Sequence, residues 1–347
     1  QGLFTGFDPA SPLCGWRSGA DERLPAEVRD LLAVAADGQT RTGGAFNVRT
    51  AVLTRRWLQA TSDGVEPSDG ELAALAASIA APPYEVDDGT VRRLADCSGV
   101  DLNAIAKGHI ADLVAHRLLT ERGATRVVVN AGGDLVHRGA GSVVVGIDDP
   151  RRGDGAPPLH RIEVADAAVA TSGRARRWFD VAGRRWSRVL DPRTGRPADG
   201  TASATVVAPD AATAEVLATA ASVLAPVDTL RLLDHVAGTG TAVAALVVEP
   251  DGTQHRSPMW APISAPPPAA APTPAAGAAT PTGGPPPPGP RGPPARQAPH
   301  GAPRAGGARA GSPAPRRDGP GGSTGHPSTR RARGTRPSRL SPPPGGR

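Results

Sequence analysis

The spacing of apolar residues predicts two helices in the first third of the chain. Residues 26–36 present one apolar face, and Gly38 follows as the expected end of that helix. The segment from Ser68 to Ile79 begins with the pattern of a capping box. In such a box the Ser68 hydroxyl accepts a hydrogen bond from the first turn and the Glu71 carboxylate reaches back. A second helix is therefore expected here.

A third helix is predicted over residues 105–121, after which the period of the pattern changes. Short β-branched or apolar runs bounded by Gly and Asp follow, and these predict strands. The predicted strands are residues 126–130, 142–147, 161–164, 167–171, 177–181, 185–190, 203–208 and 241–248. Residues 182–184 look like a hairpin turn, and residues 211–224 predict one more helix. Helices first, strands in the middle, then a helix and a strand are typical of an α+β fold.

Composition divides the chain into a body, residues 1–262, and a tail, residues 263–347. The whole chain has a net charge of +6, but the tail alone carries 12 Arg and a single acid, Asp318, so the body is net negative. The tail is rich in Pro, Gly, Ala and Arg and poor in aliphatic residues, which predicts disorder. Binding of RNA or an anionic surface through its arginines is the alternative. The folded body itself is not expected to bind nucleic acid.

Lys107 is the only lysine in the chain, against 38 arginines. An ammonium is a compact charge that fits a phosphate or a narrow site, whereas a guanidinium is a wide planar group. Asp101 precedes the helix that carries Lys107, and Asn103 is expected to cap it, leaving free backbone N–H groups near the ammonium. These residues predict an anion site. Chance survival of a surface lysine is the alternative.

Two further features of the sequence are compatible with ligand binding. Glu215 and Thr219 are four residues apart on one predicted helix, so they share a face, and their hard oxygens suit Mg²⁺. An acid that only complements the helix dipole is the alternative. Glycine-rich turns at residues 130–134, 171–173 and 191–195 fit binding loops as well as ordinary tight turns.

Several common sites are excluded by the sequence. Cys14 and Cys97 cannot build a disulfide framework, and the chain has no C-x-x-C pair for zinc. It has no G-x-S-x-G, H-E-x-x-H or Walker A motif, and the turn at residues 130–134 is not the G-x-G-x-x-G of a Rossmann fold. No run approaches the roughly 18 apolar residues needed to cross a bilayer.

The chemistry-bearing segments form short motifs in a definite order. They are DLNAIAKGHIAD at 101–112, VVVNAGGDL at 127–135, ATSG at 170–173, LDPRTGRP at 190–197 and AEVLATA at 214–220, with FDPASPL at 7–13 and TGGAFNV at 42–48 upstream. In order and spacing these motifs resemble the ApbE family, the Mg²⁺-dependent FAD:protein FMN transferases. The resemblance covers about residues 7–260.

The resemblance implies an α+β fold that binds FAD and moves its FMN moiety onto a Thr or Ser of a target flavoprotein subunit, releasing AMP. It implies FAD contacts at Phe7, Ala45, Phe46, Asn47, Asp101, Lys107 and Leu190. It implies Mg²⁺ ligands at Ala104, through its carbonyl, and at Glu215 and Thr219. Such a reaction needs charge neutralisation on the pyrophosphate, which Mg²⁺ and Lys107 would supply.

Three positions depart from the family pattern. Glu215 stands where the family usually has Asp, and Asn47 replaces another usual Asp. Arg188 stands where the family has the His that takes the proton from the target hydroxyl. Arginine cannot be deprotonated at working pH and so cannot be that base. Either Asp191, Asp134 or the target protein accepts the proton instead, or transfer is slow or absent.

Two other activities follow from the same motifs. One is hydrolysis of FAD to FMN and AMP by water, and the other is FAD binding without catalysis, because Arg188 replaces the family His. Family members are commonly exported and membrane-associated. The chain opens with Gln1 instead of Met, so a processed or truncated start is expected.

Overall fold

A computed structural model of the chain describes residues 2–6, 8–20, 23–153, 155–174 and 178–265. All of these residues belong to one compact unit, residues 1–274. Phe7 and nearly all of the predicted tail lie outside the described residues, so the boundary at residue 262 and the role of Phe7 stay predictions. No described helix is long and apolar enough to span a bilayer.

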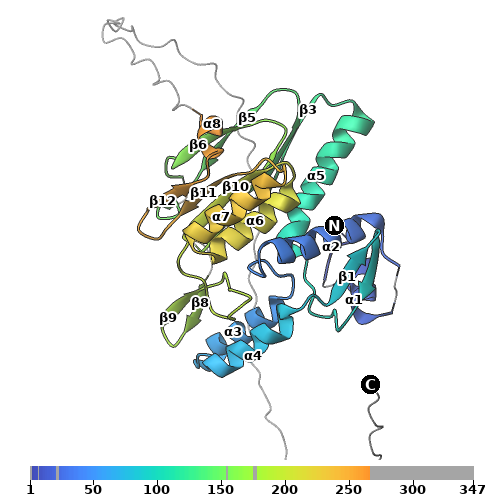
Figure 1. Cartoon of the computed structure of the whole chain (residues 1–347), viewed down its shortest axis with the longest axis vertical. Helices are drawn as coiled ribbons and strands as arrows, with labels where there is room; N and C mark the ends of the chain where they lie inside the picture. Colours follow the sequence, from blue (N-terminus) through green and yellow to red (C-terminus); the bar gives the residue numbers. More distant parts are fainter. Residues whose placement is uncertain (1, 7, 21–22, 154, 175–177, 266–347) are drawn as a thin grey trace, which may run out of the picture. The chain divides into compact units, whose positions relative to one another are not determined.

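The described chain combines helices with antiparallel strands, which confirms the α+β prediction (Figure 1). The helices are α1 (Pro12–Ser18), α2 (Ala26–Arg41), α3 (Ala51–Asp63), α4 (Asp69–Ala80), α5 (Asn103–Arg122), α6 (Ala211–Val223), α7 (Pro226–Gly238) and α8 (Trp260–Ile263). The strands are β1 (Tyr84–Asp87), β2 (Thr90–Arg93), β3 (Arg126–Ala131), β4 (Asp134–Gly139), β5 (Val143–Ile147), β6 (His160–Val164), β7 (Ala168–Gly173), β8 (Trp178–Val181), β9 (Arg184–Ser187), β10 (Ser203–Ala208), β11 (Ala244–Val248) and β12 (Gln254–Arg256).

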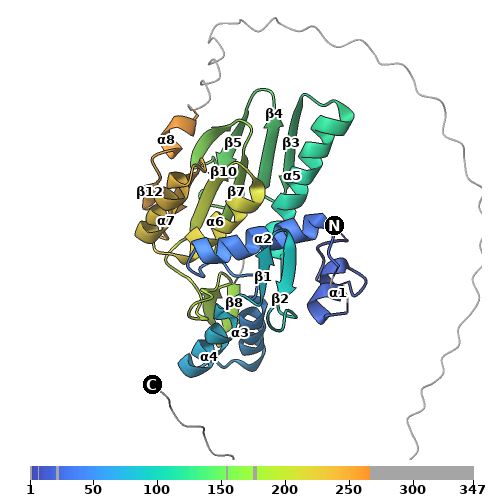
Figure 2. The ribbon, with the colours of Figure 1, turned by 45° about the vertical axis from the view of Figure 1, so that its right-hand side comes forward.

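The main sheet has six strands in the order β12–β11–β10–β7–β4–β3, all paired antiparallel. Strand β10 lies inside it and is buried at every position. Its side chains alternate between the two faces: Val206 packs with Leu217 of α6, and Val207 packs with Ile162 of β6 and with Trp260 of α8. Helix α6 lies against β7 and β10 (Figure 2). The sheet is therefore covered on both faces, and α6 is held firmly on one of them.

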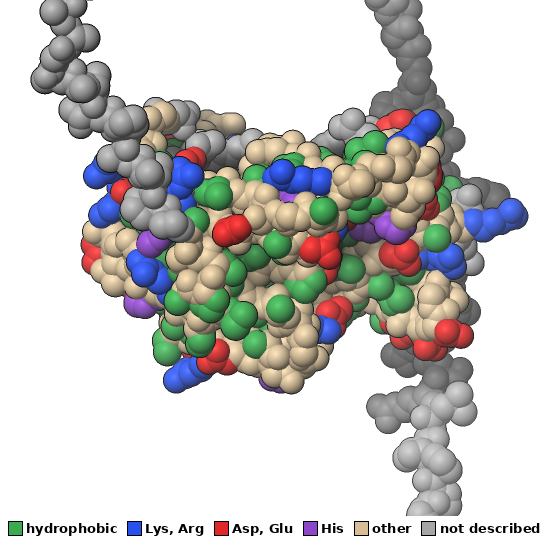
Figure 3. All heavy atoms as spheres, turned by 90° about the horizontal axis from the view of Figure 1, so that it is seen from above, with side chains coloured by type: hydrophobic (Ala, Val, Ile, Leu, Met, Phe, Trp, Pro, Cys, Tyr) green, Lys and Arg blue, Asp and Glu red, His purple; other side chains and the backbone are tan. Residues whose placement is uncertain are grey.

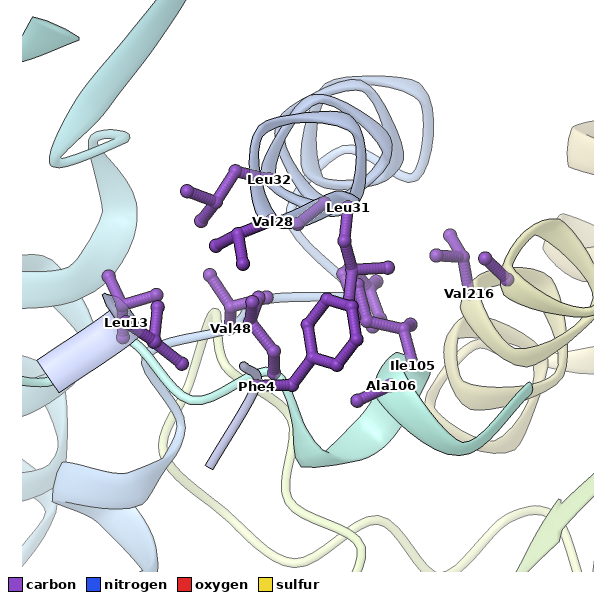
Figure 4. Packing of buried hydrophobic residues seen from close by; sticks show 14 of the residues in the cluster. Phe4, Leu13, Val28, Leu31, Leu32, Val48, Ile105, Ala106 and Val216 are labelled. Atoms are coloured by element: carbon purple, nitrogen blue, oxygen red, sulfur yellow. The ribbon is translucent and has the colours of Figure 1, made fainter. Parts of the chain in front are cut away.

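A second core lies where α2, α5 and α6 meet. Leu31 of α2, Ile105 of α5 and Val216 of α6 pack together with Phe4 (Figure 4). These side chains are nearly or fully buried. This core fixes the first turns of α5 beside α6, which places the motif around Lys107 next to the helix of Glu215.

Gly38 does not end α2, contrary to the prediction, because the helix continues to Arg41. A Cβ atom built at Gly38 would lie 2.7 Å from Cγ1 of Val216 on α6. The missing side chain thus lets α2 pack closely on α6. A glycine that ends a helix and one that allows helices to touch look alike in a single sequence.

The two predicted helix starts are partly corrected. Ser68 accepts a hydrogen bond from the N–H of Glu71 at 3.3 Å, as predicted, but the Glu71 carboxylate pairs with Arg56 instead of reaching back. Asn103 is the first residue of α5 and does not cap it. Leu102 is the N-cap residue and makes no side-chain cap bond, but Asp101 just before it satisfies the first turn, because its Oδ1 accepts a hydrogen bond from the N–H of Asn103 at 2.9 Å.

Most predicted strands lie within a few residues of the observed ones. The hairpin between β8 and β9 is confirmed, with positive φ at both Ala182 and Gly183, as a two-residue turn requires. Strand β12 follows the strand that was predicted to be the last. Helices α1, α3 and α7 and the β1–β2 ribbon lie where the sequence pattern gave no prediction.

The ion pair of Asp149, just after β5, should stabilise the fold in a way that depends on pH. Hydrogen bonds from Arg151, at 2.9 Å from Nε and Nη2, lower the pKa of this buried carboxyl to about 2. The unfolded carboxyl titrates near 4, so the stabilisation is present above that pH and is lost as the pH falls toward 2. Asp149→Asn should lower the free energy of unfolding by about 1 to 2 kcal/mol at pH 7.

Denaturant unfolding at a series of pH values measures this effect. The difference between the wild type and Asp149→Asn should shrink as the pH falls from about 4 to 2. Asp199→Asn, at an exposed position, is the matched control and should leave stability unchanged. A difference that is constant over this pH range would contradict the assignment to the ionised carboxylate.

Candidate functional site

Helices α5 and α6 are in close contact where Gly108 faces Ala211 and Glu215. A Cβ atom built at Gly108 would lie 2.8 Å from Cβ of Ala211 and 2.8 Å from Oε2 of Glu215. The N–H of Gly108 donates to the same Oε2 at 3.3 Å. The absence of a side chain at Gly108 therefore lets the Glu215 carboxylate reach the backbone of α5.

The ammonium of Lys107 lies between two carboxylates. It donates to Oε1 of Glu215 at 3.0 Å and forms an ion pair with Asp134. The side chains of Glu215 and Asp134 are 3% and 8% exposed, whereas that of Lys107 is 54% exposed. Burial raises the pKa of Glu215 to about 8; Asp134 adds to the rise and Lys107 opposes it. Two buried acids thus share one ammonium that faces solvent.

The turn between β3 and β4 brings Asp134 to Lys107. Gly132 and Gly133 both have positive φ, and the N–H of Gly133 donates to Oδ1 of Asn130 at 3.0 Å. Asp134 is the first residue of β4 and points back to α5. The sequence did not decide whether the glycine-rich turn at residues 130–134 is a binding loop or an ordinary turn. In the structure this turn supplies the third member of the cluster, Asp134.

The oxygens around this cluster fit a hard cation. Within the described residues no three His, Cys, Asp or Glu side chains are arranged to hold a metal, so backbone and hydroxyl oxygens would have to contribute. In a regular helix the Ala104 carbonyl faces the N–H of Gly108, the group that also reaches Glu215. Thr219 lies one turn beyond Glu215 on α6. Two acids beside one ammonium favour one more positive charge, which in the metal-free cluster is a proton on Glu215, as its raised pKa indicates. Mg²⁺ would replace that proton, so the residues fit the ion.

Asp112 anchors the start of α6 on α5, a role that the sequence analysis did not find. Its Oδ2 accepts a hydrogen bond from the N–H of Ala211 at 2.6 Å. Arg138 of β4 pairs with Asp112 and also donates to the carbonyl of Pro209 at 2.7 Å. Asp112 is four residues beyond Gly108, so it faces α6 from the next turn. The four-residue spacing between Gly108 and Asp112 is visible in the motif at 101–112, so the shared face could have been predicted.

A pocket of about 700 Å³ opens beside the end of α2. An alanine-rich face of α4 forms an apolar wall, and Asn47, Arg193 and Arg196 supply polar groups. Asn47 is itself fixed, because its Nδ2 donates to the carbonyl of Ile79 at 2.9 Å. Gln39 of α2 similarly donates to the carbonyl of Ala80 at 3.0 Å. Two amide hydrogen bonds therefore join α4 to the α2 side of the pocket.

The other predicted FAD contacts do not line this pocket. Ala45 and Phe46 are buried in the core under α2, and Leu190 is buried in a separate cluster with Trp57. Asp101 is half-buried before α5, where it accepts the hydrogen bond from Asn103. The structure thus brings Lys107, Glu215 and Asp134 together with Ala104 nearby, and it brings Asn47 into the pocket. The roles of these residues toward FAD and Mg²⁺ stay predictions.

The model of the ApbE family matches residues 1–244, which is more than half of the chain. The chain belongs to the ApbE family. The resemblance carried by the short motifs is therefore confirmed.

Curated relatives of this ApbE chain are called FAD:protein FMN transferases. One from Treponema pallidum is 32% identical over 237 residues, which cover 61% of this chain and 62% of the relative. One from Vibrio cholerae is 33% identical over 191 residues, which cover 53% of this chain and 56% of the relative. The chain thus spans about three fifths of the length of these relatives.

Solved ApbE structures have the same fold. The ApbE protein of Thermotoga maritima superposes with a TM-score of 0.65 at 28% identity, covering 76% of this chain and 87% of that one. The flavin transferase ApbE of Vibrio cholerae gives a TM-score of 0.60 at 24% identity, covering 75% and 85%, and supports the fold alone.

One of the three departures from the ApbE pattern, Arg188, directly follows β9. Arg188 is exposed, and its guanidinium lies 5.2 Å from the ring centre of Phe179. Asp191, the suggested substitute base, is already engaged: Arg193 donates to each of its carboxylate oxygens at 2.9 Å. Asp134 is paired with Lys107. In this ApbE chain each candidate acid is therefore held by a cation.

Proposed function

We propose that this ApbE chain transfers the FMN moiety of FAD to a Thr or Ser hydroxyl of a target flavoprotein and releases AMP. The observation that carries the proposal is the cluster of Lys107, Asp134 and Glu215, in which one ammonium lies between two buried carboxylates. The names of the curated relatives support the same activity.

The reaction needs opposite charge around a pyrophosphate, and the chain's own residues can supply and orient it. Glu215, Thr219 and the Ala104 carbonyl would hold Mg²⁺, which neutralises phosphate charge when bound. The half-exposed Lys107 ammonium can turn from the carboxylates to a phosphate oxygen, because its other side faces solvent. The acceptor oxygen bonds to the FMN phosphorus, the bond from that phosphorus to the AMP oxygen breaks, and the acceptor proton leaves to a base.

Hydrolysis of FAD to FMN and AMP is the second candidate, and the solvent exposure of Lys107 favours it. A protein hydroxyl and a water molecule both lose a proton during attack, and Arg188 can accept neither proton. Water can reach an open site without a docked protein. The hydrolytic reaction needs the same phosphate-binding residues, so both candidates depend on the Lys107 cluster.

One experiment separates these activities from binding alone. The full chain is incubated with FAD, Mg²⁺ and a peptide with one threonine, and the products are separated by chromatography and mass spectrometry. Flavin covalently bound to the peptide with AMP released supports transfer, whereas free FMN and AMP support hydrolysis. Intact bound FAD overturns both reactions. Lys107→Ala should weaken FAD binding, and unchanged affinity would count against the cluster.

Restoring a base at position 188 is expected to increase transfer. Arg188→His places a neutral imidazole at the family position of the base, and general base catalysis typically contributes about 100-fold or more. Arg188→Gln removes the same charge without supplying a base and is the matched control. The rate of peptide flavinylation should rise in the histidine variant alone. Equal rates in both variants would mean that loss of the charge, and not the base, is responsible.

A further inference from the structure

Helix α4 ends without a backbone cap from its own chain. The last carbonyls of a helix have no partner inside it, and the N–H groups just beyond the C-cap residue often satisfy them. After the C-cap residue Ala81, however, the chain continues with Pro82 and Pro83, which have no N–H. The carbonyl that the N–H of residue 82 would usually reach is that of Ile79. The end of α4 therefore needs donors from elsewhere in the chain.

Two side chains from the α2 side of the pocket supply these donors. Nε2 of Gln39 donates to the carbonyl of Ala80 at 3.0 Å, and Nδ2 of Asn47 donates to that of Ile79 at 2.9 Å. Both amide residues are buried, each with 6% of its surface exposed. A hydrogen bond in such a place is costly to lose, because water does not replace it. Two buried amides thus cap a helix to which they do not belong.

Asn47 has two partners that an amide serves at once and a carboxylate does not. Its Oδ1 accepts a hydrogen bond from the N–H of Arg49 at 2.8 Å, while its Nδ2 donates to the carbonyl of Ile79. A carboxylate would accept the first bond, but it has no hydrogen for the second and would set a negative oxygen against the carbonyl oxygen. The Asp that the ApbE family usually has at this position is therefore incompatible with this end of α4.

Apolar packing holds α4 to α3 but not to α2. Ile79 packs with Leu53 and Trp57 of α3. Past its first turn, the side of α4 that lines the pocket carries only alanines, namely Ala73, Ala76, Ala77 and Ala80. Because these methyl groups border a pocket instead of a packed interface, the two amide hydrogen bonds set where this wall stands relative to α2.

The wall faces a pocket with both apolar and polar borders. Arg193 and Arg196 supply cationic groups at its rim. At the opposite end of the molecule, basic, acidic and apolar side chains of the described residues are interspersed over the surface (Figure 3). A ligand with a flat apolar part and a charged part, such as FAD under the proposed function, therefore suits the pocket beside α4.

We infer that Asn47 and Gln39 are positioning residues that hold the α4 wall of the pocket at the distance from α2 that the ligand requires. Asn47 acts through α4, and its departure from the Asp of the family matches a helix end that has no cap of its own. The identity of the ligand, FAD, rests on the proposed function. The two hydrogen bonds themselves are measurable without any ligand.

Restoring the family residue in the full chain tests the hydrogen bonds. Asn47→Asp keeps the acceptor for the N–H of Arg49 and removes the donor for the carbonyl of Ile79. Amide hydrogen exchange, followed by mass spectrometry, should become at least about tenfold faster in peptides from α4 and stay unchanged in those from α5 and α6. Gln39→Glu removes the other donor and should act alike. Gln59→Glu makes the same chemical change at an exposed position on α3 and is the matched control.

FAD binding, followed by flavin fluorescence, and the FAD dependence of turnover give the functional readout. Asn47→Asp should raise Kd and KM for FAD about tenfold, because the wall is no longer preorganised. Its kcat at saturating FAD should stay within about twofold of the wild type, since the Lys107 cluster is unchanged. A general loss of the fold would lower kcat as well, so the split between KM and kcat separates positioning from instability.

Two results would overturn the inference. Equal or tighter FAD binding by Asn47→Asp would show that the wall does not depend on the amide, whether or not exchange in α4 is faster. A lower kcat with an unchanged KM would place Asn47 at the reacting groups instead of at the wall.

The outcomes for the wall and for the proposed function are distinguishable. A wild type that binds FAD intact, and binds it more tightly than Asn47→Asp does, would keep the inference and remove the transfer function. Transfer of FMN by the wild type and by Asn47→Asp with equal KM would keep the function and overturn the inference. A wild type that leaves FAD unbound would overturn both.

Discussion

Under the proposed function, replacing Glu215 by glutamine should abolish turnover of FAD with Mg²⁺ while leaving the fold intact. Glutamine keeps the size of the side chain but removes the anionic oxygen, so turnover of FAD should fall by at least about 100-fold. Burial and Asp134 raise the pKa of Glu215 to about 8, so without metal the neutral glutamine resembles the carboxyl group that it replaces. The free energy of unfolding should therefore change by less than about 1 kcal/mol.

Product formation from FAD at saturating Mg²⁺, together with thermal unfolding without metal, measures both effects. Glu215→Asp provides the residue that the family usually has and should keep most of the activity. Glu249→Gln changes an acid that pairs with His255 and should have no effect on turnover. Magnesium-dependent turnover that persists in Glu215→Gln would remove this carboxylate from the reaction.

Adding one methyl group at Gly108 should disturb both the fold and the site. The new Cβ would meet Cβ of Ala211 and Oε2 of Glu215 at 2.8 Å each, so α5 and α6 must move apart. Overpacking of this kind costs about 1 to 3 kcal/mol, which outweighs the roughly 1 kcal/mol that alanine gains over glycine in a helix. Gly108→Ala should therefore be destabilised, and its FAD turnover should fall because Glu215 is displaced from Lys107.

A double-mutant cycle isolates the cause. Ala211→Gly removes one of the two clashing groups, so the double variant should recover part of the stability lost in Gly108→Ala. Gly70→Ala is the control for helix propensity, because a Cβ at Gly70 in α4 meets nothing within 4 Å. It should be neutral or stabilising. Additive effects of the two substitutions in the cycle would show that the helix contact is not the origin of the loss.

The sequence predicted the secondary structure well wherever periodicity was strong. Strand β10 and helix α6 agree with the predicted ranges to within one residue, because a buried strand and a long apolar helix give clear patterns. The ends were less certain, since Gly38 lies inside α2 and Asn103 lies inside α5. A glycine or polar residue near a helix end can cap the helix or make a contact with another element. The sequence alone does not distinguish these two roles.

Two residues of the Lys107 cluster were singled out from the sequence, but the contacts that join them were not. Lys107 and Glu215 were each found from the sequence, one by its rarity and one by its spacing to Thr219. That a single ammonium bridges Glu215 and Asp134 depends on how the β3–β4 turn meets α5, which is a long-range contact. The same reason explains why Asp112, which holds α6 from α5, was missed.

The pocket lies on a seam between two separately packed cores. Phe46 belongs to the core of α2, α5 and α6, whereas Leu190 belongs to that of α3, α4 and the β8–β9 hairpin around Trp57. Amide hydrogen bonds from Gln39 and Asn47 cross between them. Because breaking such bonds exposes little apolar surface, the seam can widen at far less cost than either core can loosen. In the proposed function, FAD would therefore enter along this seam, where amide hydrogen bonds break while the packing of both cores is kept.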